Sequence, residues 1–286
     1  MPSGGGFLAH EPLIRLASFT AVFAVMAIWE ALTPRRAQTI SRWKRWPNNL
    51  AVVVVNTAVL RVIFPAAAIG TAFFAAEHGW GVLNALHGPA WIAVPLSVVL
   101  LDLAIYAQHV AFHAVPPLWR LHRMHHADLE FDVTTGLRFH PIEIVLSMVI
   151  KLAVVAALGA PALGVLLFEV LLNASSMFNH GNVCLSGVVD GVLRWVVVTP
   201  EMHRVHHSIV RRETDSNFGF NLPWWDRLFG TYRRAPAAGH EGMMIGIDQF
   251  RDPVELRLDR MLLQPFRDDQ PAIEPDAPTS TRTRVR

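Results

Sequence analysis

Residues 90–126 read AWIAVPLSVVLLDLAIYAQHVAFHAVPPLWRLHRMHH, an apolar stretch that leads directly into five histidines. A run of about twenty apolar residues is long enough to cross a bilayer as a helix. The pattern that ends this stretch, His-x-x-His-His at 122–126, returns as HRVHH at 203–207. The stretch therefore predicts a membrane span with a histidine cluster at its end, and the repeat predicts a second half for that cluster.

The composition also indicates a membrane protein. Of the 286 residues, 52% are hydrophobic, and the mean hydropathy is +0.32. The single cysteine, Cys184, excludes a disulfide framework, a cysteine-held iron–sulfur cluster and a CxxC zinc site. The net charge is only +2 and no nucleic-acid-binding motif is present, so we expect no nucleic acid partner.

Further apolar stretches flank the opening one. We predict spans at 12–32, at 50–76 and from residue 90, and a hairpin at 141–178 that either crosses the membrane or re-enters it. The start of the chain lacks the features of a secretory signal peptide and is predicted to be flexible. The last stretch, RDDQPAIEPDAPTSTRTRVR, is polar and is predicted to be a disordered tail.

The order of the spans brings both histidine motifs to one side of the membrane. The loop at 33–49 is basic, and short basic loops are typical of the cytoplasmic side. The second span then leads out and the third returns, so residues 109–140 are cytoplasmic. The hairpin returns the chain to the same side whether or not it crosses, so residues 180–286 are cytoplasmic as well. The two motifs are therefore expected to face each other.

The histidines are concentrated in a few short windows. Eight of the fourteen fall in HVAFH, HRMHH and HRVHH, at offsets of three and four residues that share one helix face. Such a cluster of imidazoles predicts a metal site, and eight exceed what one metal needs, so we expect two metals. Imidazole suits zinc, iron, copper and nickel alike. The eight are His109, His113, His122, His125, His126, His203, His206 and His207.

Several other residues are candidates near this site. His180 follows the last apolar segment at the right depth and is predicted to be a further ligand. Asp102, two helical turns before His109, and Asp128 could each orient a ligand histidine by accepting its second N–H. His140 is predicted to have a structural or orienting role.

Two other classes of function are compatible with clustered histidines. A membrane zinc hydrolase is disfavoured, because no acidic residue lies between the histidines and no HExxH motif is present. A metal transporter or a haem electron carrier remains an alternative, although transporters usually bind their ions near the midplane rather than at span ends. A two-metal site beside lipid favours oxygen chemistry on an apolar substrate.

Five motifs together resemble the fatty acid hydroxylase superfamily, which includes the sterol desaturases. They are HVAFH, HRMHH, NHGN, HRVHH and NFGFNLPWWDRLFGTY, and they cover about residues 95–232. The resemblance implies a non-haem di-iron centre at the cytoplasmic membrane surface that activates O2 and attacks a C–H bond of a lipid. It also implies that the eight clustered histidines and His180 are the ligands. Some members carry a further histidine four residues before His180, where this chain has Ser176.

The predicted fold class is all-α: a multi-pass transmembrane bundle with a cytoplasmic, histidine-rich helical cap. We divide the chain into an N-terminal transmembrane region (1–94), a fatty acid hydroxylase-like catalytic domain (95–234) that includes the hairpin at 141–178, and a C-terminal cytoplasmic segment with the tail (235–286). An integral protein of the bacterial inner membrane or the endoplasmic reticulum is expected.

The chemistry needs electrons that this chain does not supply by itself. No nucleotide-binding GxGxxG fingerprint follows a strand, and one cysteine cannot hold an iron–sulfur cluster. We therefore expect a ferredoxin- or cytochrome-type donor. Its docking site, or alternatively a site for lipid headgroups, is predicted at a basic patch of Arg120, Arg123, Arg204, Arg211 and Arg212. The substrate is a membrane lipid: a sterol, fatty acyl, sphingoid or ether-lipid chain fits equally.

Overall fold

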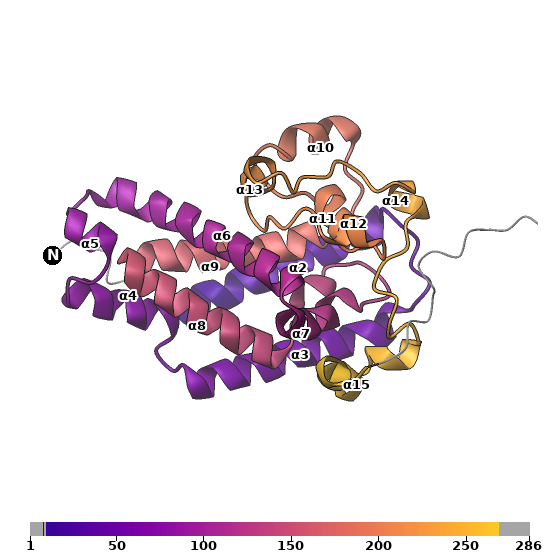
Figure 1. Ribbon diagram of the computed structural model, residues 1–286, viewed down its shortest axis with the longest axis horizontal. Coiled ribbons are helices and arrows are strands. Elements are labelled where there is room, and N and C mark those ends of the chain that lie inside the picture. The colour runs from indigo at the N-terminus through magenta and orange to yellow at the C-terminus, as the bar shows by residue number, and fades with distance from the viewer. Residues whose placement is uncertain (1–7, 9, 269–286) are drawn as a thin grey trace, which may run out of the picture.

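The computed structural model describes residues 8 and 10–268, and every regular element within them is a helix. Most of the predicted flexible start and tail lies outside the described residues. Figure 1 shows the long helices aligned along one axis, with most of the short helices gathered at one end. Five segments are long and apolar enough to cross a membrane: Glu11–Leu32, Arg42–Leu86, Ala90–Ala114, Pro141–Leu158 and Ala162–Asn179. The predicted all-α, multi-pass bundle is confirmed.

The second predicted span differs from the structure at both ends. It consists of α3 (Arg42–Ile63) and α4 (Ala67–Glu77), followed by the short α5 (Val82–Leu86). The helix begins at residue 42, inside the predicted loop, because the Ser41 hydroxyl accepts a hydrogen bond from the backbone N of Trp43 and caps it. The break follows from Pro65, which forces the preceding Phe64 out of the helical conformation.

The hairpin at 141–178 reaches the far end of the bundle. Its helices, α8 (Pro141–Leu158) and α9 (Ala162–Asn179), are each about 27 Å long at the usual helical rise. They turn at Gly159, whose backbone packs so closely on Gly81 that a Cβ added at Gly81 would lie 2.0 Å from the Gly159 nitrogen. The hairpin thus ends beside the α4–α5 turn, as a full crossing requires.

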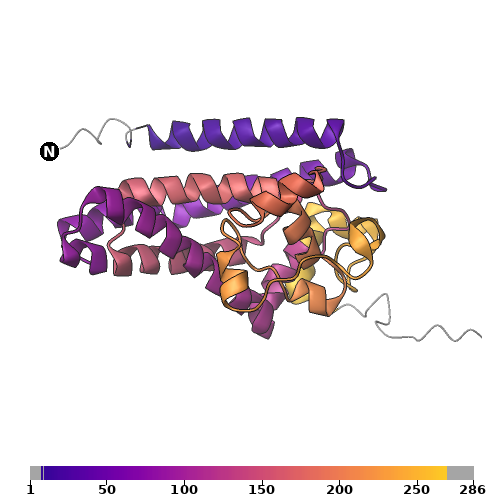
Figure 2. The ribbon, with the colours of Figure 1, turned by 90° about the horizontal axis from the view of Figure 1, so that it is seen from above.

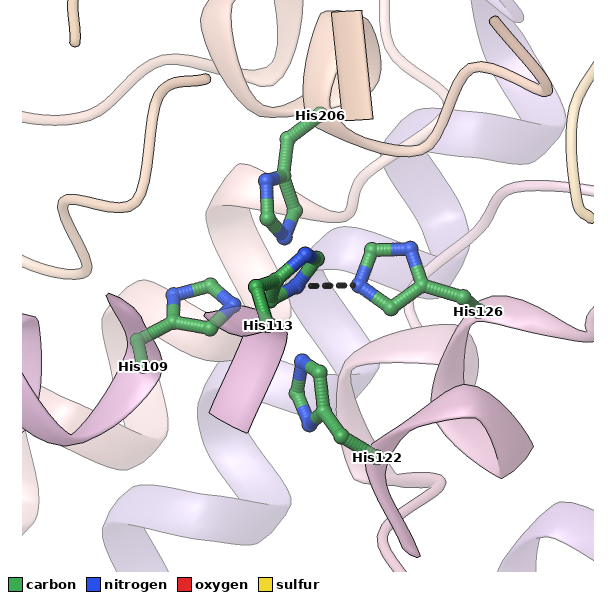
Figure 3. A group of neighbouring side chains, drawn as sticks. All are labelled: His109, His113, His122, His126 and His206. Carbon is green, nitrogen blue, oxygen red and sulfur yellow. Dashed lines mark hydrogen bonds between the residues drawn. The ribbon is translucent and has the colours of Figure 1, made fainter. Parts of the chain in front are cut away.

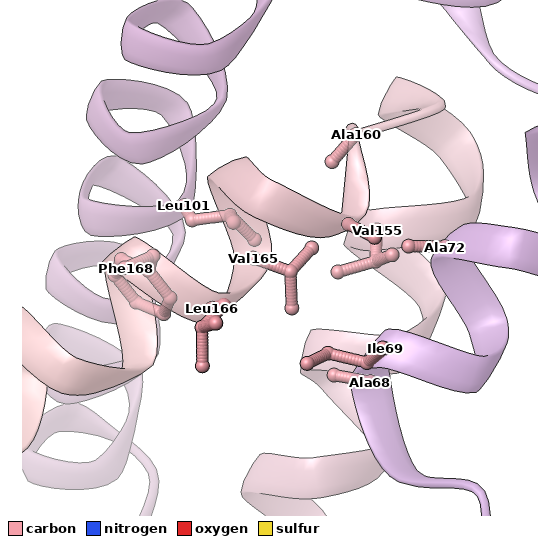
Figure 4. Close-up of a cluster of buried hydrophobic side chains, with 10 residues drawn as sticks. Ala68, Ile69, Ala72, Leu101, Val155, Ala160, Val165, Leu166 and Phe168 are labelled. Atoms are coloured by element: carbon pink, nitrogen blue, oxygen red, sulfur yellow. The ribbon is translucent and has the colours of Figure 1, made fainter. Parts of the chain in front are cut away.

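Small apolar residues hold the spans together. Gly164 of α9 lies so close to Ser97 that an added Cβ would be 3.1 Å from the serine Cβ, and α6 (Ala90–Ala114) and α9 approach closely there. Figure 4 shows the main buried cluster, which joins α4, α6, α8 and α9. Helix α2 (Glu11–Leu32) packs on α9 and, as Figure 2 shows, lies along one side of the bundle.

The cap begins where two prolines turn the chain. Val115 is extended because Pro116 follows it, and Pro116 starts α7 (Pro116–His126) across the end of the bundle. The basic loop after α2 lies at this same end, since Pro34 pairs with Val183. The remaining cap elements are η1 (Thr135–Leu137), α10 (Gly187–Leu193), α11 (Pro200–His206), α12 (Arg211–Thr214), α13 (Trp224–Leu228), α14 (Gly239–Gly242), η2 (Pro253–Leu256), α15 (Leu258–Leu263) and η3 (Gln264–Phe266).

Candidate metal centre

The nine predicted histidines lie together at the cap end of the bundle, in two groups. Within each group the nearest ring nitrogens are all within 4.8 Å of one another. Figure 3 shows the first group, whose imidazoles from α6, α7 and α11 point toward a common centre. We call it the five-histidine group: His109, His113, His122, His126 and His206. The four-histidine group consists of His125, His180, His203 and His207.

The repeated motif explains how two groups form from the same helices. In HRMHH the residues at i and i+4, His122 and His126, join the five-histidine group, and His125 joins the other. In HRVHH the assignment is reversed: His203 and His207 join the four-histidine group, and His206 the five-histidine group. Each motif therefore contributes two histidines, four residues apart, to one group and one histidine to the other.

Buried oxygen atoms fix the orientation of most rings in the five-histidine group. The Nδ1 atoms of His109 and His206 lie 2.8 and 2.7 Å from the carbonyl oxygens of Phe218 and Ser216. His122 Nδ1 lies 2.7 Å from the Glu143 carboxylate. Because Nδ1–H donates to these oxygens, the lone pair of each ring is on Nε2, which is the atom a metal binds. His113 Nδ1 makes a longer contact, 3.3 Å, to Asp215.

The four-histidine group converges on one atom. His180 Nε2 lies 3.2, 3.0 and 3.2 Å from the Nε2 atoms of His125, His203 and His207. His180 Nδ1 donates to the carbonyl of Ser176 at 2.8 Å, so its Nε2 carries only a lone pair. Nitrogens bound to one metal at about 2.1 Å each are about 3 Å apart, which is the spacing observed.

Hydrogen bonds within the described chain do not satisfy these nitrogens. The Nε2 atoms of His109, His122 and His206 are buried without a partner there, and so are the Nδ1 atoms of His125, His126, His203 and His207. Buried polar atoms without partners are costly. A cation at each centre would accept the converging Nε2 lone pairs, so the residues present fit a pair of metal ions. The four Nδ1 atoms lie on the other side of their rings, and such cations would not contact them.

The environment keeps six of these rings neutral. None of the nine residues is more than 6% exposed. Burial lowers the pKa of His180 and His206 to about 3. Burial, followed by the neighbouring imidazoles, lowers the pKa values of His125, His126, His203 and His207 well below the ordinary value. Neutral imidazoles are metal ligands, whereas protonated ones are not.

The three residues predicted to orient a ligand histidine contact other partners. Asp102 accepts from Trp225 Nε1 at 2.9 Å and from the backbone of the 217–232 stretch, whose Phe218 carbonyl holds His109. Its influence on the histidine is therefore indirect. His140 caps α8, accepting from the backbone N of Ile142, and so places the helix that carries Glu143.

Asp128 belongs to a buried ion cluster behind α7. Arg45 donates to it at 2.9 and 2.7 Å, and to Asp132 at 2.5 Å, with all three side chains inaccessible to solvent. Burial by itself would raise the pKa of Asp128, but the charges of Arg45 and Arg138 outweigh it, and that pKa lies below its usual range. The cluster fixes the loop after HRMHH to α3.

Sequence reasoning missed the residues that contact the rings most directly. Glu143 had no distinguishing motif, and backbone carbonyls leave no mark in a sequence. Asp226, in the closing WDRLFGTY stretch, accepts from the backbone nitrogens of Phe218 and Gly219 at 2.8 Å each. That aspartate therefore positions the Phe218 carbonyl for His109, and its place in the motif was the available signal.

The predicted basic patch of five arginines is wrong for two of them, Arg123 and Arg204, which are buried. Arg204 is fully buried and pairs with Glu201 at 3.2 Å. Arg123 is 4% exposed and donates to the carbonyl of Gln264 at 2.6 Å. These two arginines hold the cap together and do not present a continuous charged surface with the others.

A cavity of about 460 Å³ adjoins the five-histidine group. His109, His122 and Glu143 line one part of it, and Lys151 and Glu169 line another. Lys151 lies eight residues beyond Glu143 on α8, about 12 Å along the helix. The remaining lining is mostly apolar and comes from α2, α3, α4, α6, α8 and α9 and from η1, so the cavity lies among the candidate spans at their cap end.

Known proteins share this chain's sequence pattern. The fatty acid hydroxylase family model matches residues 94–231. An ornithine lipid hydroxylase of Rhizobium tropici is 28% identical over 81% of this chain and 72% of its own length. The alkylglycerol monooxygenase of Homo sapiens is 25% identical over 58% of the chain, which spans only 36% of that protein. A Delta(7)-sterol-C5(6)-desaturase of Nicotiana tabacum is 25% identical over 65% of the chain and 69% of its own length.

No solved structure matches the chain. The family match covers the segment that carries all nine grouped histidines, and the relatives are named as a hydroxylase, a monooxygenase and a desaturase. These findings confirm the resemblance drawn from the five motifs. Residues 94–231 thus match the fatty acid hydroxylase family, and the chain is an oxidoreductase, as its motifs indicated.

Proposed function

We propose that the chain is an integral-membrane, non-haem di-iron oxygenase that uses O2 and external electrons to hydroxylate or desaturate a C–H position of a membrane lipid. One observation carries this proposal: two buried groups of five and four histidines, with converging lone pairs, lie beside a cavity among apolar spans. The proposed ligands are the nine histidines of those groups.

The alternatives fit the site less well. One zinc ion takes about four ligands, and nine imidazoles in two groups exceed that. Bis-histidine haem needs a flat macrocycle between two imidazoles, but three Nε2 atoms surround that of His180 at 3.0–3.2 Å. A transport site is expected near the midplane, whereas these histidines lie at the ends of the spans.

The chain's own residues would position the reaction and keep water out. When bound, an iron pair supplies O2 activation and C–H oxidation. The Glu143 carboxylate and the carbonyls of Phe218 and Ser216 hold the rings in register for the metal. The Ser176 carbonyl does the same for His180, so position 176 orients a ligand here although it is not a histidine. The apolar cavity admits a lipid from the side.

The substrate class, electron donor and location follow as parts of the same proposal. The named relatives act on an ornithine lipid, alkylglycerols and a sterol, and we propose a membrane lipid of this general kind. A ferredoxin- or cytochrome-type protein would supply electrons. The histidine end carries the basic loop after α2, which supports a cytoplasmic active site in a bacterial inner membrane or the endoplasmic reticulum. We keep 95–234 as the catalytic domain.

Metal analysis of the purified protein tests the proposal. We expect about two irons per chain in the wild type, since each group can hold one. His125→Ala should lower the iron content and abolish product formation. His78→Ala, at an exposed position near the far end of the bundle, is the matched control and should leave both unchanged. One zinc per chain, or the absorption band of a haem, would contradict the proposal.

Lipid analysis of cells with and without the active protein then separates the two reactions. A lipid that gains one oxygen indicates hydroxylation, and a lipid that loses two hydrogens indicates desaturation. If neither lipid appears while iron is bound, the oxygenase proposal is wrong.

A further inference from the structure

A second cleft, of about 670 Å³, lies in the cap among α10, α13 and the segment 232–235. None of the nine grouped histidines lines it. Four arginines and two carboxylates, those of Asp190 and Glu201, do so, and the lining is therefore positively charged. The arginines are Arg35, Arg194, Arg227 and Arg234.

Two of these arginines are held in fixed positions. The Arg227 guanidinium lies 4.0 Å from the ring centre of Trp195 and 4.1 Å from that of Tyr232, and it donates to the Arg194 carbonyl at 2.8 Å. Arg194 donates to the Tyr232 hydroxyl at 3.0 Å and pairs with Asp190. The Nε atoms of both arginines are buried without a hydrogen-bond partner in the described chain. These buried Nε atoms are out of reach of a ligand, but cationic guanidinium groups held in fixed positions along a cleft are suited to an anion.

Large apolar side chains surround the cleft. On α10, Val188 is 80% exposed and Val192 65%, and Trp195 just beyond the helix is 61% exposed. On and after α13, Leu228 is 69% exposed and Phe229 56%. Soluble surfaces rarely gather so many exposed apolar residues, whereas membrane-surface helices do.

Contacts with α6 place this surface at the level of the bilayer. Phe229 stacks on Tyr106 with ring centres 5.4 Å apart, and Trp225 Nε1 donates to Asp102. Tyr106 and Asp102 lie eight and twelve residues before the end of α6 at Ala114, or about 12 and 18 Å along the helix. Figure 1 shows α10 and α13 beside the bundle rather than beyond its end. The Phe229 side of this surface therefore lies next to a membrane-spanning helix.

We propose that this cleft binds the phosphate group of an anionic phospholipid in the leaflet at the histidine end, with the apolar side chains of α10 and α13 among the acyl chains. The arginines recognise the phosphate charge, and the position beside α6 supplies the acyl environment. A soluble acidic protein would satisfy the arginines but would leave Val188, Val192 and Leu228 facing water or lipid. The proposal is independent of the reaction carried out at the histidine groups.

Cys184 provides a direct measurement, because it is the only cysteine, is exposed and lines the cleft. The full chain is reconstituted into nanodiscs of phosphatidylcholine alone or mixed with phosphatidylglycerol, and the rate of Cys184 alkylation by N-ethylmaleimide is followed by mass spectrometry. We expect phosphatidylglycerol to slow the alkylation of Cys184 in proportion to the fraction of clefts that the lipid occupies. Each arginine removed should weaken lipid binding about fivefold, since a basic residue near an anionic surface contributes about 1 kcal/mol.

Arg234→Gln and Arg227→Gln are the test variants, and Arg257→Gln, on an exposed arginine outside the cleft, is the matched control. The control should retain the slowing and the test variants should lose it, with an unchanged size-exclusion elution volume showing that each variant is folded. Inorganic phosphate added to phosphatidylcholine nanodiscs should not protect Cys184. Equal alkylation rates in both lipids, or equal protection by free phosphate, would overturn the lipid assignment. Loss of protection in the control would show a non-specific charge effect and would overturn it as well.

Quenching of Trp195 by brominated phosphatidylglycerol gives a second readout that does not involve the cysteine. The difference in fluorescence between the wild type and Trp195→Phe gives the contribution of Trp195. We expect brominated phosphatidylglycerol to quench this contribution. An unquenched Trp195 would show that the surface around α10 does not enter the leaflet.

Discussion

The two histidine groups differ in how the protein holds them. In the five-histidine group, four of the five rings have an Nδ1 contact to an oxygen outside the group, and three of these contacts are 2.7–2.8 Å long. In the four-histidine group only His180 has such a contact, and the Nδ1 atoms of its other three members are buried without one. Contacts with the rest of the fold orient the first group, whereas in the second group a bound metal, as proposed, would have to hold three of the four rings.

The groups also differ in what they face. His109 and His122 of the five-histidine group line the cavity among the spans, and no member of the four-histidine group is among the described residues that line it. The rigid group is thus the one next to the proposed substrate. Pre-orientation of ligands where the substrate binds limits the movement needed during the reaction, and the second group can tolerate looser anchoring because the substrate does not contact it.

The largest effect is expected from His180→Ala. This change removes the ring whose Nε2 lies within 3.2 Å of three others, so the four-histidine group loses its centre. We expect the metal content to fall by half and activity to fall on the order of a thousandfold, because residues that act as a unit fail together. Metal analysis of the same sample checks both parts. Retention of the full metal content would show that the four-histidine group does not need His180 to bind its metal.

Much of this site could be predicted from spacing. The offsets of three and four residues indicated which histidines share a face, and the alternation of spans placed both motifs at one end. The division between groups could not be predicted, because it depends on the angle at which α7 and α11 meet. Nor could the anchors: Glu143 contacts a histidine 21 residues away, and Phe218 one 109 residues away.

The fold was predictable to a similar degree. Apolar length identified the spans, but Arg45, which falls in the predicted basic loop at 33–49, lies in a helix and is fully buried against Asp128 and Asp132. The density of basic residues in a loop indicates the side of the membrane. It does not show that Arg45 pairs with Asp128, 83 residues later in the chain. Pro65 was a visible signal that the second apolar stretch would break.

An intermediate effect is expected from Glu143→Gln, which reduces the difference between the groups. The amide keeps the shape of the side chain but removes the charge that holds His122 Nδ1–H at 2.7 Å. Loss of such a carboxylate partner typically weakens metal binding by about 10–100-fold. Chelator titration of the wild type should release metal from the four-histidine group first. In the variant the five-histidine group should release its metal at a lower chelator concentration, closer to the step of the four-histidine group. If both release steps stay where they are in the wild type, Glu143 does not anchor His122 for metal binding.

The smallest effect is expected from Asp215→Asn, which removes the weakest of the four anchors. The Asp215 side chain is 35% exposed, its contact to His113 is 3.3 Å long, and it also pairs with Arg211 at the surface. Exposed pairs of this kind contribute about 0–1 kcal/mol, so metal affinity should fall no more than about fivefold. Because His113 also packs against Trp119, with ring centres 4.9 Å apart, the ring keeps its place without this contact. If metal affinity falls as much as in Glu143→Gln, then the length and burial of a contact do not determine how strongly it anchors a histidine. The two groups would then differ only in that the five-histidine group lines the cavity.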